Sequence, residues 1–234
     1  MTPEKPWLFL LPGMLCDAEV WREQIPALQR HFHLHVPVFR EYDDFVAMAR
    51  SVLAHRANKF SLVAHSMGGR VAMELLRLAP GRIEQVVLMD MGVHPVAEGE
   101  NERNQKLLLL AETGGLAAVA DSWIPLMIHP RRQNDSLLVE RIRTMVLRHD
   151  VKVLNKQLLA AQHRADQRQY LQGISHHIHI LCGDNDNWNP PELHQRMHVQ
   201  LRNSDLVILD ECGHMAPMEQ PEAVNQHLVN WLCK

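Results

Sequence analysis

Residues 60–69 read Phe-Ser-Leu-Val-Ala-His-Ser-Met-Gly-Gly, an apolar run that ends at a serine with small residues two positions to either side. This is the pattern of a nucleophile elbow, a tight bend between a strand and a helix that carries an exposed serine. Such a bend holds strained backbone angles, so Ala64 and Gly68 must be small to let the two elements nearly touch. The stretch predicts that Ser66 points out of the fold, toward a substrate.

The sequence on either side of the serine has the hydrophobic spacing that such a bend needs. Phe60, Leu62 and Val63 form a buried-strand pattern before it. After it, apolar residues recur at helical spacing until Ala79-Pro80-Gly81 stops the run, and these are Val71, Ala72, Leu75, Leu76 and Leu78. Taken by itself, the stretch also fits an ordinary helix capped by a serine.

Short apolar runs alternate with helical patterns along the rest of the chain. This alternation is typical of parallel strand-helix-strand units. The expected strands are residues 7–11, 33–38, 60–64, 85–89, 177–182 and 205–209. Helices are expected from Asp17, from Asp43, after Ser66, from Pro190-Pro191 and at the end of the chain. The sequence therefore predicts an α/β fold with about six parallel strands flanked by helices.

Residues 92–172 interrupt this alternation because they show helical patterns and no strand pattern. Gly114-Gly115 and Pro130 separate the helical stretches, and Asp135 and Asp150 are candidates for helix caps. An insertion at the carboxyl edge of a parallel sheet lies over the place where ligands bind. We therefore expect a helical lid insertion at 92–172 between two parts of one core, 1–91 and 173–234. Trp123 and Met127 are candidates for the apolar lining of a substrate pocket.

Composition places the chain among ordinary globular proteins. Its 234 residues are 46% hydrophobic, its formal net charge is −3, and no basic stripe suggests a nucleic-acid surface. The four cysteines share no C-x-x-C spacing and are expected to be reduced; they are Cys16, Cys182, Cys212 and Cys233. The sequence shows no targeting segment or membrane-length run, so we expect a cytoplasmic protein that binds neither membrane nor nucleic acid.

Histidine is abundant, with 16 residues, and its spacing raises the question of a metal site. His31, His33 and His35 have the alternate spacing that places side chains on one strand face, and so do His177 and His179. Metals can use this spacing. No carboxylate or cysteine is recognised in register with either group. The segment 184–189 also lacks the glycine and glutamate of a calcium loop. We therefore expect no metal.

An exposed serine becomes a nucleophile only when a base takes its proton, and histidine held in one tautomer by an acid is the usual base. In α/β folds the three residues follow the chain order serine, acid, histidine. Both partners follow expected strands here, with Gly183-Asp184-Asn185-Asp186 after one strand and Gly213-His214 after the next. The ordered trio is a stronger signal than any of its parts.

With these motifs in place, the chain resembles the α/β-hydrolase superfamily. The resemblance depends on 11–14 (Leu-Pro-Gly-Met), 64–69, Asp166, Arg168, Leu171, Ile174, 183–186, Gly213-His214, Glu219 and Pro221. It runs from residue 7 to the end of the chain and is weakest in the insertion. The chain looks most similar to small esterases with helical lids, such as the pimeloyl-ester carboxylesterases of biotin synthesis and related menaquinone-pathway enzymes.

The resemblance implies a role for each member of the trio. Ser66 is the nucleophile, His214 is the general base and then acid, and Asp186 is the carboxylate that orients the histidine. Asp186 is favoured because the family acid stands three residues after the glycine. Asp184 is its nearest rival. Asp90 is a second rival, because some relatives take the acid from the end of that strand.

The negative oxygen of a tetrahedral intermediate needs preorganised N–H donors. One candidate is the backbone N–H of Met67, at the start of the helix after the elbow, where the helix dipole also helps. The resemblance gives the backbone N–H of Met14 as the second donor. Here Pro12-Gly13 replaces the family's common His-Gly, which leaves a backbone donor intact. The chain also opens almost directly on the strand before this loop, so we expect the family's N-terminal antiparallel strands to be missing.

The resemblance implies a carboxylic-ester hydrolase that forms an acyl-enzyme, needs no cofactor and acts on a small-molecule ester with a small or medium acyl group. Thioesterases, C–C hydrolases and menaquinone-type lyases use the same triad and stay open as alternatives. Arg131, Arg132 or Arg143 could pair with a carboxylate-bearing substrate. Arginines in such stretches more commonly lie on solvated helix faces. A non-catalytic binding protein is a further alternative, although such proteins usually lose a triad member. Monomer and homodimer both stay open.

Overall fold

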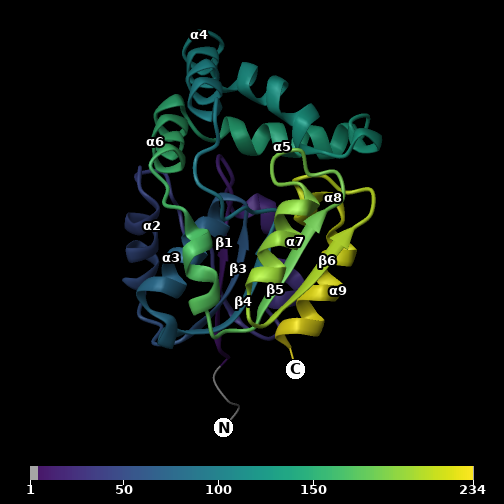
Figure 1. The fold of residues 1–234 in the computed structure, drawn as a ribbon. Coiled ribbons are helices and arrows are strands. Elements are labelled where there is room, and N and C mark those ends of the chain that lie inside the picture. The colour runs from purple at the N-terminus through teal and green to yellow at the C-terminus, as the bar shows by residue number, and fades with distance from the viewer. Residues whose placement is uncertain (1–4, 234) are drawn as a thin grey trace.

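Six strands form one sheet, and every pairing between them is parallel (Figure 1). The computed structural model describes residues 5–233. The strands are β1 (Trp7–Leu11), β2 (His33–His35), β3 (Phe60–His65), β4 (Ile83–Met89), β5 (Ile178–Gly183) and β6 (Ser204–Leu209), in the order β2-β1-β3-β4-β5-β6. The predicted fold of six parallel strands is confirmed. Within the described range no antiparallel strand precedes β1, as expected.

The hydrophobic core is divided between the two faces of the sheet, because successive residues of a strand point to opposite sides. Leu8 and Leu10 belong to one hydrophobic cluster, whereas Phe9 and Leu11 belong to the other. The first face is covered by η1 (Ala18–Trp21), α1 (Ile25–Leu28) and α9 (Pro221–Leu232). The second face is covered by α2 (Phe45–Leu53), α3 (Met67–Leu78) and α7 (Pro191–Gln200). Two short elements, η2 (Pro80–Arg82) and α8 (Ala216–Glu219), lie in connections.

Two early elements are shorter than the sequence predicts. Strand β2 ends at His35 instead of Val38, since Pro37 has no N–H to give to a ladder and β2 pairs with β1 only. The helix expected from Asp17 is a 3-10 turn, η1, followed by the single-turn helix α1. The Asp17 side chain caps η1 by accepting the Glu19 N–H.

Between β4 and β5 the chain forms only helices, turns and loops. They are α4 (Glu100–Met127), η3 (Pro130–Arg132), α5 (Ser136–Leu147), α6 (Val151–Gln162) and η4 (Gln167–Gly173). Gly115 breaks α4 with a φ of 70° and a ψ of −178°, and the Asp135 and Asp150 side chains cap α5 and α6. Figure 1 shows α4, α5 and α6 over the end of the sheet opposite the two chain termini. The expected helix breaks are confirmed, whereas the boundaries of the lid insertion at 92 and 172 stay a prediction.

Helix α4 is unusually long and apolar. Among residues 5–233 it is the one helix whose length and apolarity would suffice to cross a membrane. The backbone break at Gly115 divides it, and it packs against α5 and α6.

The start of α3 lies so close to β1 that only glycine fits at position 68. A Cβ added to Gly68 would lie 2.3 Å from the Leu11 carbonyl oxygen, a backbone atom that cannot rotate away. We expect Gly68→Ala to lower the free energy of unfolding by at least about 1–3 kcal/mol. Urea denaturation measures this. Gly81→Ala is the matched control, because nothing lies within 4 Å of the added carbon; equal losses in the two variants would contradict the close packing.

Candidate active site

Ser66 lies on the bend between β3 and α3 in a strained backbone conformation. Its φ is 51° and its ψ is −115°, outside the regions that a residue with a side chain ordinarily adopts. The loop after β1 approaches the same point, since a Cβ placed on Gly13 would lie 3.3 Å from the Ser66 Cβ. The sequence prediction of a sharp elbow with small neighbours is confirmed.

His214 lies on the loop between β6 and α8, and it is 1% exposed. Its backbone N–H donates to the Met127 carbonyl at 2.6 Å, and its own carbonyl accepts a hydrogen bond from the His65 Nε2 at 2.8 Å. Both peptide groups of the histidine are therefore held, one by the end of α4 and one by the residue before Ser66. This bracing fixes the direction of the imidazole ring.

The Glu219 carboxylate is hydrogen-bonded to the same loop on both sides of His214. One carboxylate oxygen accepts the N–H groups of Gly213 and Met215, each at 3.0 Å, and the other accepts the His129 N–H at 2.7 Å. Burial raises the pKa of Glu219, although these three N–H donors oppose the rise. A single buried side chain thus ties the residues on both sides of the histidine to the lid insertion. The sequence resemblance included Glu219 but gave it no role.

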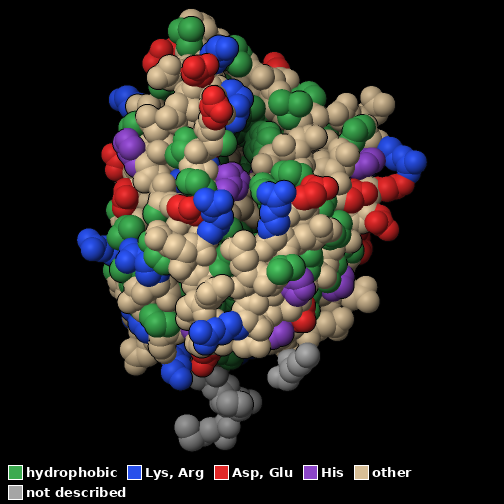
Figure 2. Space-filling model, viewed as in Figure 1, with side chains coloured by type: hydrophobic (Ala, Val, Ile, Leu, Met, Phe, Trp, Pro, Cys, Tyr) green, Lys and Arg blue, Asp and Glu red, His purple; other side chains and the backbone are tan. Residues whose placement is uncertain are grey.

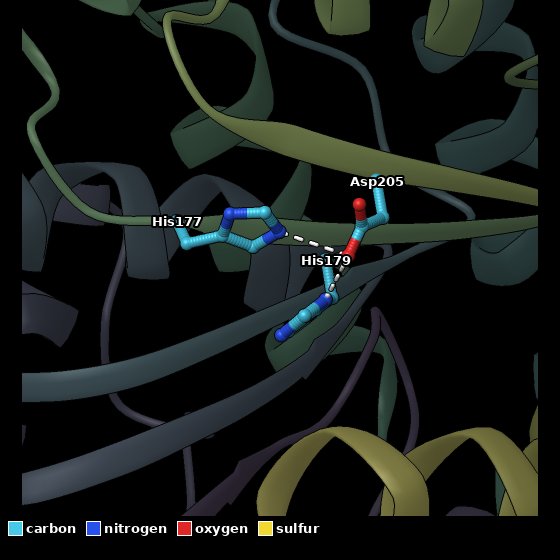
Figure 3. A group of neighbouring side chains, drawn as sticks. All are labelled: His177, His179 and Asp205. Carbon is cyan, nitrogen blue, oxygen red and sulfur yellow. Dashed lines mark hydrogen bonds and ion pairs between the residues drawn. The ribbon is translucent and has the colours of Figure 1, made fainter.

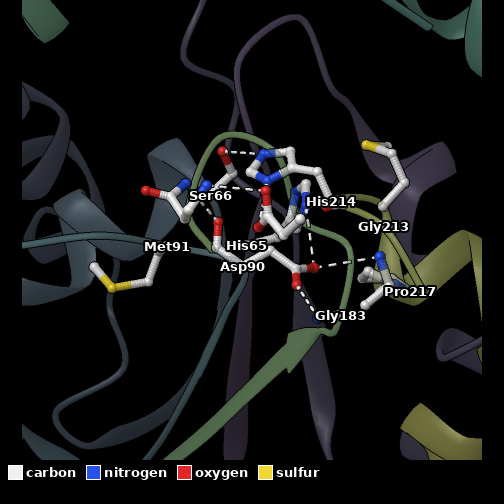
Figure 4. A network of polar contacts seen from close by, with 12 residues as sticks. His65, Ser66, Asp90, Met91, Gly183, Gly213, His214 and Pro217 are labelled. Atoms are coloured by element: carbon white, nitrogen blue, oxygen red, sulfur yellow. Dashed lines mark hydrogen bonds and ion pairs between the residues drawn. The ribbon is translucent and has the colours of Figure 1, made fainter. Parts of the chain in front are cut away.

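Ser66, His214 and Asp186 form one chain of hydrogen bonds. The Ser66 Oγ lies 2.8 Å from the His214 Nε2, and the His214 Nδ1 lies 2.8 Å from the Asp186 Oδ2. Figure 4 shows the Ser66 and His214 side chains pointing toward one another. A carboxylate only accepts, so the Nδ1 carries the proton and the Nε2 is left to accept from the serine hydroxyl.

The surroundings of Asp186 favour its ionised form. Burial raises the pKa of this carboxyl, but the charge and hydrogen bond of His214 and the N–H groups of Asn189 and Trp188 outweigh burial and lower the pKa below its ordinary value. The Oδ1 accepts both N–H groups at 2.9 Å. The carboxylate that faces the histidine is therefore fixed in position and charged.

The two rival acids have other partners. The Asp90 carboxyl accepts the Gly183 N–H, as Figure 4 shows, and it also accepts the Ala216 N–H. Burial together with the charge of Asp186 raises the pKa of Asp90 well above its ordinary value. The Asp184 side chain is bonded to the Cys212 N–H. Neither carboxyl is hydrogen-bonded to His214, and of the three candidates the structure brings Asp186 to the imidazole.

The two predicted N–H donors come from the residue after Ser66 and from the loop after β1. Met67 is the first residue of α3, where the N–H groups are free of helical partners and the dipole is positive. Met14 follows Gly13 in the loop whose backbone approaches the Ser66 side chain. These positions are compatible with a shared anion site beside the Ser66 hydroxyl.

Trp188 is an aromatic residue of the site that sequence reasoning missed. Its ring lies 4.7 Å from the His214 ring, between centroids, and 5.1 Å from the ring of Trp123. Trp123, from α4, is therefore one aromatic ring away from the imidazole. The sequence feature that could have pointed to Trp188 is its position two residues after Asp186. On the face drawn in Figure 2, hydrophobic side chains gather around a hollow between the lid helices and the body below them.

Met127 occupies the end of α4, with its side chain buried in the cluster shared by the sheet and the lid insertion. Its place in a substrate pocket stays a prediction. A separate cavity of about 530 Å³ lies between η1, the loop after β2 and the turn between α5 and α6. Its lining begins at Cys16, two residues after Met14, and includes none of the hydrogen-bonded trio.

The three arginines considered as partners of a substrate carboxylate form ion pairs within the chain instead. Arg131 pairs with Glu211, Arg132 pairs with Asp135 at 2.7 Å, and Arg143 pairs with Asp121 at 3.2 Å. Each of the three guanidinium groups thus has an acidic partner. The arrangement matches solvated helix faces and gives no preference for a carboxylate-bearing substrate.

His65 should make the fold sensitive to acid, and His65→Gln should remove that sensitivity. Burial, followed by the charge of His214, lowers the pKa of His65 to about 3. The unfolded chain, with an ordinary histidine pKa of about 6.5, binds the proton first as the pH falls. Stability that is present above about pH 6.5 is therefore lost toward pH 3, at up to about 1.4 kcal/mol per pH unit.

The measurement is urea unfolding of both proteins at pH 7 and pH 5. Glutamine can still donate to the His214 carbonyl but has no proton to gain in this range. We expect the wild type to lose up to about 2 kcal/mol more than His65→Gln between the two pH values. Identical losses would show that His65 takes up its proton in the folded chain as readily as in the unfolded chain.

Comparisons with known proteins identify the family of this chain. The model of the Alpha/beta hydrolase family matches residues 8–227. The chain is 26% identical to a pimeloyl-[acyl-carrier protein] methyl ester esterase of Pectobacterium carotovorum, covering 95% of this chain and 92% of the relative. It is 27% identical to a 2-succinyl-6-hydroxy-2,4-cyclohexadiene-1-carboxylate synthase of Klebsiella pneumoniae, covering 95% and 92%.

A solved structure gives the same picture. The thermophilic esterase from Thermogutta terrifontis superposes with a TM-score of 0.89 at 26% identity, covering 98% of this chain and 90% of the other. The family match spans nearly the whole chain, and it includes the elbow, the lid insertion and the histidine loop. The chain therefore belongs to the alpha/beta hydrolase family, and its homologues and structural neighbours include esterases.

Proposed function

We propose that this hydrolase cleaves carboxylic esters of small or medium acyl groups through an acyl-enzyme intermediate on Ser66. The observation that carries the proposal is the chain of 2.8 Å hydrogen bonds from Ser66 through His214 to Asp186, on a serine with a φ of 51°. A strained serine bonded to an oriented imidazole is the arrangement that nucleophilic acyl transfer requires.

In the acylation step the Ser66 oxygen attacks the ester carbonyl while the His214 Nε2 takes the hydroxyl proton. The protonated imidazole then gives this proton to the leaving alkoxide, so the alcohol departs and the acyl group stays on Ser66. In the second step His214 takes a proton from water, the hydroxide attacks the acyl carbonyl, and the proton returns to Ser66 as the acid leaves. Asp186 stabilises the imidazolium in both steps and keeps its own charge.

The backbone N–H groups of Met14 and Met67 would hold the negative oxygen of each tetrahedral intermediate. Both belong to the backbone beside Ser66, so they are already oriented before the charge develops. Preorganised donors of this kind contribute about 2.7–4 kcal/mol each to lowering the barrier in acyl transfer.

The residues around the imidazole support an uncharged acyl group. Trp188 lies against the His214 ring and Trp123 lies against Trp188, and the lid insertion lies over this end of the sheet. Apolar walls favour an uncharged hydrocarbon acyl chain. Trp123 and Met127 remain the proposed lining on the lid side, and the paired arginines give no counter-charge for an anionic acyl group.

The proposal is tested by measuring the turnover of p-nitrophenyl esters with acyl chains of increasing length, with matched thioesters and an anionic ester alongside. We expect the highest kcat/KM with a short or medium uncharged ester and background rates with Ser66→Ala. A fluorophosphonate probe distinguishes the alternatives. Labelling of Ser66 without ester or thioester turnover would favour C–C cleavage or lyase chemistry, and failure to label the folded protein would favour a binding protein.

A further inference from the structure

A group of side chains that could bind a metal ion lies at the opposite end of the sheet from Ser66. His177 and His179 stand at the start of β5, and Asp205 stands at the start of β6 (Figure 3). His179 and Asp205 are Cα partners in the parallel ladder between these strands. The sequence reading that no carboxylate falls in register with these histidines is therefore wrong, because the carboxylate comes from the neighbouring strand.

The three side chains converge on one point. The His177 Nε2 lies 2.8 Å from the Asp205 Oδ2, and the His179 Nδ1 lies 3.0 Å from the same oxygen. The three possible ligand atoms all lie within 4.8 Å of one another. A tetrahedral zinc ion with bonds of about 2.0–2.1 Å separates its ligand atoms by roughly 3.3 Å. To surround one, the two hydrogen-bonded pairs must widen slightly, and the two histidine nitrogens must come within that distance of each other.

The more buried histidine of the group is held in place before any ion binds. The His179 ring stacks on the Trp231 ring with centroids 4.7 Å apart and planes 11° apart, and its side chain is 13% exposed. His177 and Asp205 are about half exposed, at 49% and 52%. An ion can therefore enter from solvent, and water can fill its remaining positions.

The types of ligand atom determine which metal ions the group favours. Two imidazole nitrogens and one carboxylate oxygen suit zinc, whereas magnesium and calcium prefer oxygen ligands throughout. The carboxylate also supplies a negative charge, and the nitrogens that now face it are those that would bind the metal. In a three-ligand site with open positions, zinc is exchangeable instead of permanently enclosed.

We propose that His177, His179 and Asp205 form a zinc-binding site that ties the edge strand β6 to β5. Strand β6 is the last strand of the sheet and pairs with β5 only, so its outer edge has no ladder partner among the described strands. A metal bonded to both strands adds a link across this pair and stabilises the folded chain by mass action. The site is independent of the proposed ester hydrolysis, because it lies at the other end of β5 from the loop that carries Asp186.

The experiment is calorimetric titration of ZnCl₂ into the tag-free, metal-stripped full-length protein, with thermal unfolding in parallel. We expect one equivalent to bind to the wild type and to raise its Tm. Asp205→Asn and His177→Ala should each weaken binding by at least about tenfold, since even outer-shell changes at metal sites cost 10–100-fold. Both residues are half exposed, so the variants should remain folded.

His163→Ala, at an exposed position on the end of α6, is the matched histidine control and should bind zinc like the wild type. Ester turnover without zinc should be the same in Asp205→Asn and the wild type. Zinc binding that is equally tight in Asp205→Asn, or that is lost instead in Asp186→Asn, would overturn the assignment. So would a wild type that binds no zinc at millimolar concentrations.

Discussion

We expect Ser66→Ala to lower kcat for the proposed ester hydrolysis by at least about 10⁴-fold while leaving the fold intact. The variant removes the oxygen that attacks the carbonyl, and the remaining groups can only orient a water molecule. Alanine is small enough for the elbow, where the neighbouring backbone of the β1 loop leaves little room. Initial rates at saturating p-nitrophenyl ester, together with the Tm, measure both parts of the expectation.

Ser51→Ala is the control for this variant. Ser51 lies on α2, and its hydroxyl donates only to the Met48 carbonyl of the same helix. It should retain the wild-type rate. The double variant Ser66→Ala with His214→Ala should be no slower than Ser66→Ala alone, because the two groups act as a unit. A Ser66→Ala protein with more than a few per cent of the wild-type rate would place the nucleophile elsewhere.

Asp186→Asn is expected to lower kcat by about 10³–10⁴-fold. An amide nitrogen facing the His214 Nδ1 is a donor, so the imidazole would move its proton to the Nε2 and lose the ability to accept from Ser66. The amide oxygen can still accept the N–H groups of Trp188 and Asn189, which hold the loop. The loss should therefore fall on kcat, with KM changed little.

Asp184→Asn separates this role from a general effect of charge on the loop. Asp184 is exposed, and its side chain accepts the Cys212 N–H, which an amide oxygen can also do. Its kcat should stay within a few-fold of the wild type. Equal losses in the two variants would mean that the loop, and not one carboxylate, orients His214.

Most of the fold was predictable because the strands of a buried parallel sheet read as short apolar runs. The runs at 7–11 and 60–64 mark β1 and all but the last residue of β3. The errors lie where local backbone chemistry overrides the apolar pattern. Pro37 ends β2 early, and η1 and α1 are single turns in place of one helix.

The candidate site divides in a similar way. Chain order and turn residues identify Ser66, Asp186 and His214, because each lies in the connection that follows a strand. The contact of Trp188 with His214 and the hydrogen bonds of Glu219 depend on how loops pack against one another. Hydrophobic periodicity in the sequence does not reveal this packing. The register of Asp205 against His179 is equally hidden, since one strand's spacing says nothing about the offset of its neighbour.

Mass spectrometry of the protein after reaction with a fluorophosphonate probe tests the central claim most directly. The account predicts one adduct per chain, located by peptide mapping on Ser66, absent from Ser66→Ala, and formed far more slowly in His214→Ala. An adduct on another residue, undiminished labelling of folded Ser66→Ala, or a folded wild type that stays unmodified would contradict it.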